Sequence, residues 1–140
     1  MATGEENLST LLSTVQPTLA PDTYVFLTTT KSLSSLPLST LQPQVLVQEA
    51  EGITIVTTEA LALSHGFTEA IFPCKKISLT VHSSLEAVGL TAAIANRLKD
   101  YRISANVVSG FYHDHVYIPA GREDDAMKCL VEIAEEAKKK

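Results

Sequence analysis

The alternation of apolar and polar residues in the second half of the chain predicts a strand, and longer periods after it predict helices. Residues 75–81 read KKISLTV, in which every second side chain from the isoleucine onward is apolar, as in a strand with one buried face. Residues 84–101 repeat apolar side chains at helical spacing. Two short apolar runs, 103–109 and 115–119, predict a hairpin, and residues 123–138 predict a last amphipathic helix.

The first half carries similar patterns less clearly. Residues 5–15 place apolar side chains at helical spacing, and Pro17 is expected to end that helix. Residues 23–30 are rich in β-branched and aromatic side chains and predict a strand, whereas residues 31–44 mix serine, leucine and proline without a period. Residues 45–66 predict a hairpin followed by a short helix.

Both halves therefore follow the order strand, connection, strand, turn, strand, helix. Each resembles the ferredoxin-like order βαββαβ with its last strand missing or shared, and the first half also lacks a helix within residues 31–44. The predicted fold class is α+β: two intertwined ferredoxin-like units, residues 1–70 and 71–140, with antiparallel sheets and helices on one face. Two ways of completing the sheets remain open: residues 75–81 serve both sheets, or residues 24–29 join the second.

The composition excludes several classes of protein. With 11 Lys and Arg against 16 Asp and Glu, the chain carries a net charge of −5, whereas nucleic-acid binding needs a basic surface. No segment is long and apolar enough to span a membrane, and the N-terminus lacks the apolar core of a signal sequence. Cys74 and Cys129 are too few for a disulfide framework and lack metal-ligand spacing. We therefore expect a cytoplasmic protein that binds neither nucleic acid nor membranes.

The loop before the helix of residues 84–101 carries polar residues that fit a helix cap. Ser83 and Glu86 have the spacing of a capping box, in which each side chain accepts a hydrogen bond from the other residue's backbone N–H. Unpaired amides in the first turn of a helix also form an anion site, which suits the α-carboxylate of an amino acid. Gly89 is expected inside this helix at a cost of about 1 kcal/mol relative to alanine, which indicates close approach by another backbone or by a ligand.

A metal site is the alternative chemistry. His113 and His115 would share one face of an extended chain, with His82 as a third ligand. Two histidines without a carboxylate at an established spacing are a weak signal, and a solvated turn explains them more simply. A hydrolase built on Ser83, His82 and Asp114 is not favoured, because the G-x-S-x-G elbow is missing. We expect no catalytic residue, cofactor or metal, and keep a metal-dependent enzyme using the three histidines as an alternative.

The segment LTVHSSLEAVGLTAAIANRLKDYRISANVVSGFYHDHVYIP resembles an ACT domain. The matching features are a strand, a loop leading into a helix with Gly89, the run RISANVVSG, a polar turn and a second strand. The resemblance covers about residues 75–135, and the first half is similar to a degenerate ACT unit. The whole chain is similar to the tandem ACT units in the regulatory part of aspartate kinases, to the CASTOR amino-acid sensors, and to small stand-alone tandem-ACT proteins.

The resemblance implies a non-catalytic regulatory sensor that binds a small amino acid or a related metabolite at the interface between ACT units. Tyr112 stands where an aspartate is common in aspartate kinases, which speaks against a lysine-like or arginine-like ligand. A homodimer and a separate regulated protein are the partners that the resemblance allows, and a purely structural interaction module remains a further alternative. The ligand contacts that it implies are His82, Ser83, Ser84, Leu85, Val88, Gly89, Ile103, Ser104, Asn106 and Asp114.

Overall fold

The computed structural model describes residues 8–80 and 89–139, and its contacts divide the chain into two compact units. Residues 22–74 form the central unit, and residues 1–21 together with 75–140 form the discontinuous unit. The compact units therefore differ from the contiguous halves of the sequence repeat, since residues 8–21 pack with the C-terminal half. None of the described helices is both long and apolar enough to cross a membrane.

The central unit contains every element of the βαββαβ order. Its strands follow one another in the sheet as β3-β4-β2-β5, and the described pairs are antiparallel. The helix that the sequence did not predict within residues 31–44 is present as a short one, so that expectation is wrong. The elements are β2 (Tyr24–Thr29), the 3₁₀ helix η1 (Leu33–Ser35), α2 (Leu38–Leu41), β3 (Val45–Gln48), β4 (Ile53–Thr58), α3 (Glu59–Ser64) and the first residues of β5 (Ile71–Thr80).

The predicted hairpin and short helix of residues 45–66 are confirmed. Glu49 and Gly52 close the turn between β3 and β4 through two backbone hydrogen bonds of 3.0 and 3.2 Å. Thr58 caps α3, because its Oγ1 accepts a hydrogen bond of 3.2 Å from the N–H of Leu61. The turn and the cap thus fix the register of β4 and the start of the helix that follows it.

The discontinuous unit completes its fold with a strand from the N-terminal end of the chain. The strand order is β1-β5-β7-β6, the ferredoxin-like order in which β1 takes the place of the last strand. β1 runs antiparallel to β5, with Gln16 opposite Thr80 and Leu19 opposite Ile77. The elements are α1 (Leu8–Ser13), β1 (Gln16–Leu19), the later residues of β5, α4 (Leu90–Asp100), β6 (Asn106–Ser109), β7 (Asp114–Pro119) and α5 (Glu123–Lys138).

The strand β5 pairs with strands of both units. Its first residues pair with β2, where Cys74 lies opposite Tyr24, and its last four pair with β1. One strand therefore serves both units, but it is longer than the predicted residues 75–81: its pairs with β2 come from residues 71–74, before that segment. β2 stays in the central unit, so the alternative in which it joins the second sheet is wrong. β1 itself was not predicted, because Pro17 was expected only to end a helix; a proline is tolerated in a strand that, in the described residues, pairs on one side only.

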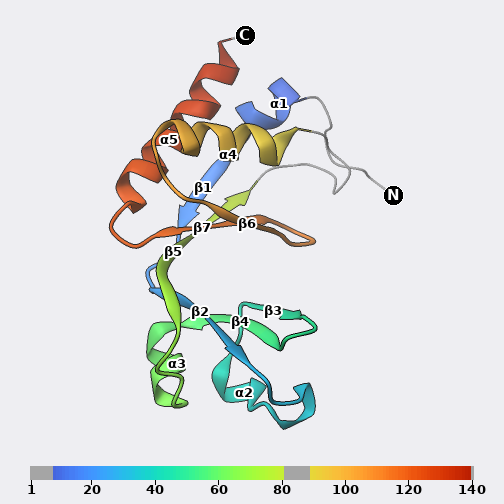
Figure 1. Cartoon of the computed structure of the whole chain (residues 1–140). Coiled ribbons are helices and arrows are strands. Elements are labelled where there is room, and N and C mark those ends of the chain that lie inside the picture. Colours follow the sequence, from blue (N-terminus) through green and yellow to red (C-terminus); the bar gives the residue numbers. More distant parts are fainter. Residues whose placement is uncertain (1–7, 81–88, 140) are drawn as a thin grey trace. The chain divides into compact units, whose positions relative to one another are not determined.

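The core of the discontinuous unit lies between one face of its sheet and three helices. The helices α1, α4 and α5 pack against one another on the same side of the strands (Figure 1). Val116 and Ile118 of β7 point into this core, so His115 and Tyr117 point to the opposite face. The predicted α+β class, with antiparallel sheets and helices on one face, is confirmed. The largest buried side chains of this core are Leu11, Ile77, Leu79, Ile94, Leu98, Val116, Ile118 and Leu130.

Candidate functional site

Gly89 lies immediately before α4 and has a left-handed backbone. Its φ is +91°, and its carbonyl accepts the 2.9 Å hydrogen bond from the N–H of Ala93 that opens the helix. The expectation that Gly89 sits inside a helix is therefore wrong, because a helix interior needs negative φ. A Cβ built at this position would lie 3.4 Å from Cδ2 of Leu8, an ordinary contact. The backbone conformation, rather than crowding, requires the glycine.

We expect Gly89→Ala to lower the free energy of unfolding by about 1–2 kcal/mol, which is the cost of a left-handed residue with a Cβ. Gly89→Asn should lower the free energy of unfolding by less, because asparagine adopts a left-handed backbone conformation more readily than alanine does. Urea denaturation of the two variants beside the unchanged protein measures both values. Equal losses in the two variants would show that the Cβ contact with Leu8, and not the sign of φ, governs the position.

The structure places the predicted ligand contacts in different parts of the discontinuous unit. His82, Ser83, Ser84, Leu85 and Val88 lie outside the described residues, as does the predicted capping box. Ile103 is buried in the core, and the adjacent Ser104 is exposed. Asn106 begins β6 and Asp114 begins β7, so antiparallel pairing puts these two at opposite ends of the hairpin. Among the described residues, only Ile103 and Ser104 come together.

Ile103 and Ser104 line an open hollow of about 400 Å³ at the C-terminal end of α4. Lys99 and Arg102 lie in the same wall, and neither side chain forms an ion pair with any described residue. The hollow therefore presents two positive charges and a hydroxyl beside apolar surface, in a chain whose net charge is −5. Its lining residues are Ala95, Lys99, Arg102, Ile103, Ser104 and Ala105.

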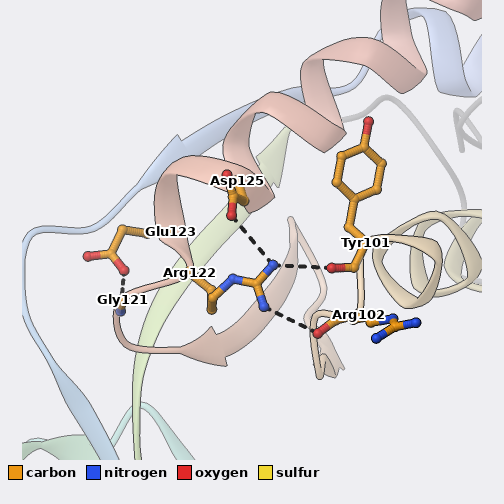
Figure 2. A network of polar contacts seen from close by, with 6 residues as sticks. All are labelled: Tyr101, Arg102, Gly121, Arg122, Glu123 and Asp125. Carbon is orange, nitrogen blue, oxygen red and sulfur yellow. Dashed lines mark hydrogen bonds and ion pairs between the residues drawn. The ribbon is translucent and has the colours of Figure 1, made fainter.

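Arg122 holds the turn that follows α4, and Figure 2 shows the contacts that it makes there. Arg102 of this turn also lines the hollow. Its guanidinium donates hydrogen bonds to the carbonyl oxygens of Tyr101 (3.1 Å) and Arg102 (3.3 Å), just after α4. Nη2 also lies 3.4 Å from Oδ2 of Asp125 in the first turn of α5. The planar donor set of arginine suits such bridging. The start of α5 is thereby tied to the end of α4, and Arg102 is held with a φ of +59°.

Sequence reasoning missed Lys99, Arg102 and Arg122. The signal available was a pair of basic residues three apart at the end of the helix predicted over 84–101. That spacing is ordinary, because basic side chains commonly occur in the last turn of a helix, where they interact with its dipole. Their position beside Ser104 depends on the left-handed turn at Arg102, which the sequence does not reveal.

A second group of polar residues lies on the face of the sheet opposite the helices. His115 Nδ1 and Ser78 Oγ share a hydrogen bond of 2.8 Å, and the ring of His113 lies 6.2 Å from that of His115. The pKa of His115 is lowered by burial first, and then by the positive charges of Lys76 and His113. Among residues 8–80 and 89–139, no three metal-binding side chains gather together. The three-histidine site stays an untested alternative, because His82 lies outside the described residues.

The two cysteines are buried thiols in different units. Burial raises the pKa of Cys74 to about 12 and that of Cys129 to about 11. A thiol needs a low pKa and access to solvent to act as a nucleophile. Both side chains are fully buried, which agrees with a packing role and gives neither of them chemistry at the candidate site.

The strand order and helices of the two units define a tandem ferredoxin-like module. Two family models, each described as an ACT domain, match residues 3–75 and 71–132. The chain belongs to the ACT domain family, as its sequence predicted. ACT domains are regulatory modules, so this membership indicates a regulatory, ligand-binding role. No curated protein matches the chain.

Solved structures agree with this assignment. A Vibrio cholerae protein of unknown function, described as a possible transport protein, is 40% identical, with 91% of this chain and 95% of that chain covered and a TM-score of 0.82. The ligand-free regulatory subunit of Thermus thermophilus aspartate kinase is 13% identical, with 84% and 95% covered and a TM-score of 0.60. Clostridium acetobutylicum aspartate kinase is 11% identical, with 87% and 34% covered and a TM-score of 0.61. The two aspartate kinases share the fold.

Proposed function

We propose that the protein is a non-catalytic regulatory sensor that binds a small amino acid or a related metabolite beside the C-terminal end of α4. The observation that carries the proposal is the hollow lined by Ile103 and Ser104, since both residues are among the ligand contacts that the resemblance to ACT domains implies. The hollow measures about 400 Å³ and is open to solvent, so a small molecule has room to lie against its wall. The expected place of the ligand at an interface between ACT units stays a prediction.

The charges of the hollow support a ligand that carries a carboxylate. Lys99 and Arg102 have no ion-pair partner among the described residues, so their charges remain for an incoming anion. The hydroxyl of Ser104 adds a group that both donates and accepts hydrogen bonds, which matches an amino acid with its two oppositely charged ends. The proposal also includes pairing of the chain with a second copy of itself, regulation of a separate protein, and a cytoplasmic location. Two buried free thiols fit a reducing compartment.

A thermal-shift screen with the proteinogenic amino acids at millimolar concentration tests the proposal. A ligand present at about 100 times its Kd should stabilise the folded protein by about 2.7 kcal/mol, which is readily measured as a rise in Tm. We expect at least one amino acid to raise the Tm, and isothermal titration calorimetry to give its affinity. If no amino acid and no simple metabolite carboxylate shifts the Tm, the proposal is wrong.

Charge-reversed variants then locate the site. Lys99→Glu and Arg102→Glu should each weaken binding of the amino acid by about tenfold, because each replaces an attraction for the carboxylate by a repulsion. The matched control is Lys128→Glu, which makes the same change of charge at an exposed position of α5 outside the hollow. Equal losses in all three variants would indicate an effect of net charge alone and would place the ligand elsewhere.

A further inference from the structure

The hairpin of β6 and β7 carries two histidines separated by one residue. His113 lies directly before β7 and His115 is its second residue. Side chains two residues apart in an extended chain point to the same side. The ring centroids are accordingly 6.2 Å apart, with an angle of 67° between the ring planes. Imidazole nitrogens are common ligands of divalent transition metals, so the spacing of the pair can be compared with that of a metal site.

The separation of the rings is close to that required by a shared metal ion. With the usual zinc–nitrogen distance, two imidazoles on one tetrahedral ion have centroids about 5 Å apart. The observed separation exceeds this by about 1 Å. His113 is exposed, so a change of its side-chain torsions can close the difference without moving the strand.

Ser78 fixes the orientation of the second histidine. Its Oγ lies 2.8 Å from Nδ1 of His115, which directs Nε2 of the same ring toward the turn that contains His113. A histidine that binds a metal through one nitrogen usually makes a hydrogen bond through the other, and this bond fixes the tautomer and the ring. Ser78 is thus placed to act as an orienting residue for a metal ligand.

Gly110 lies close to Nε2 of His115. A Cβ at this position would lie 3.7 Å from that nitrogen and 3.1 Å from the carbonyl oxygen of His113. The N–H of Gly110 donates a 2.8 Å hydrogen bond to the same carbonyl, which closes the turn. The glycine therefore brings the backbone of the turn close to the ring of His115.

We propose that His113 and His115 together bind one divalent transition-metal ion, such as zinc, with water completing the coordination. Ser78 is a positioning residue in this site. The ion would be exchangeable rather than permanently held, because the described chain supplies only two ligands and the nearby charge of Lys76 opposes a cation. The proposal does not depend on the amino-acid site, which lies at the end of α4.

Isothermal titration of the full chain with zinc chloride, in a buffer that does not chelate metals, tests the proposal. We expect saturable binding of one equivalent, abolished by His113→Asn and by His115→Asn. Ser78→Ala should weaken binding by about tenfold, the usual loss when a hydrogen bond to a metal ligand is removed. His65→Asn and His82→Asn should leave the affinity unchanged; the nitrogens of His65 already lie 2.8 Å from the Leu61 carbonyl oxygen and 2.9 Å from Thr40 Oγ1.

A second measurement keeps the test valid if a histidine variant fails to fold. In the unchanged protein, zinc should shift the NMR signals of the His113 and His115 imidazoles together and leave those of His65 in place. Absence of saturable zinc binding overturns the proposal, as does binding that survives both His113→Asn and His115→Asn. Loss of binding in His82→Asn would show that the pair alone is not the site, and would favour the three-histidine hypothesis.

Discussion

Replacement of Leu11 by alanine should lower the free energy of unfolding by about 2–5 kcal/mol. This leucine lies in α1, a helix of six residues that is far too short to be stable in isolation. Its side chain is fully buried in the core that α1 shares with α4, α5 and the sheet. The variant leaves a cavity in that core and weakens the attachment of the N-terminal residues. Urea denaturation followed by circular dichroism measures the change.

Val131→Ala is the matched control for this prediction. Val131 lies in α5 of the same unit and leaves 46% of its surface exposed, so its truncation should cost well under 1 kcal/mol. A difference between the two variants shows that the N-terminal residues belong to the core of this unit in solution. If Leu11→Ala is as mild as Val131→Ala, the packing of α1 described above is wrong.

Replacement of Arg122 by alanine should lower the free energy of unfolding by about 1–2 kcal/mol. The variant removes charge-assisted hydrogen bonds to the carbonyl oxygens of Tyr101 and Arg102 and an ion pair with Asp125, so the carbonyls after α4 lose their donor. The guanidinium is partly exposed, which reduces the loss below that of a buried network. Thermal and urea denaturation, each compared with the unchanged protein, give the value.

Lys138→Ala provides the comparison for Arg122→Ala. Lys138 forms an exposed ion pair with Glu135 at 3.8 Å, and such pairs contribute little, so a loss below about 0.5 kcal/mol is expected. Arg122→Ala should also lower the affinity for any ligand that binds in the adjacent hollow, whereas Lys138→Ala should leave that affinity unchanged. Equal stability of the two variants would mean that the turn after α4 holds its shape without Arg122.

The sequence was sufficient to predict those helices and strands whose apolar residues recur with a clear period. The alternation at Ile77 and Leu79 predicted the later part of β5, and both side chains are buried in the core. The helix expected over residues 123–138 has these same bounds in the structure, because its acidic start and apolar face leave little ambiguity. The resemblance to ACT domains rested on this half and is confirmed.

Elements that depend on distant partners could not be predicted. β1 has four residues, one of them Pro17, and it pairs with the distant β5 and packs against α5. Helix α2 is a single turn in a segment without a hydrophobic period. For the site, Ile103 and Ser104 were expected, but the neighbouring charges of Lys99 and Arg102 depend on a left-handed turn. No local pattern encodes such a turn at an arginine.

The N-terminal strand has a consequence for synthesis of the chain on the ribosome. The strand β1 is made before residues 22–74, but its pairing partner in β5 and the helix α5 that packs on it are made after residue 74. The central unit, which is contiguous, has all its partners available earlier and can fold while translation continues. β1 therefore stays unpaired until β5 is made, and the discontinuous unit is complete only when α5 has left the exit tunnel. Slow translation beyond residue 74 would prolong exposure of Leu11 and Val15.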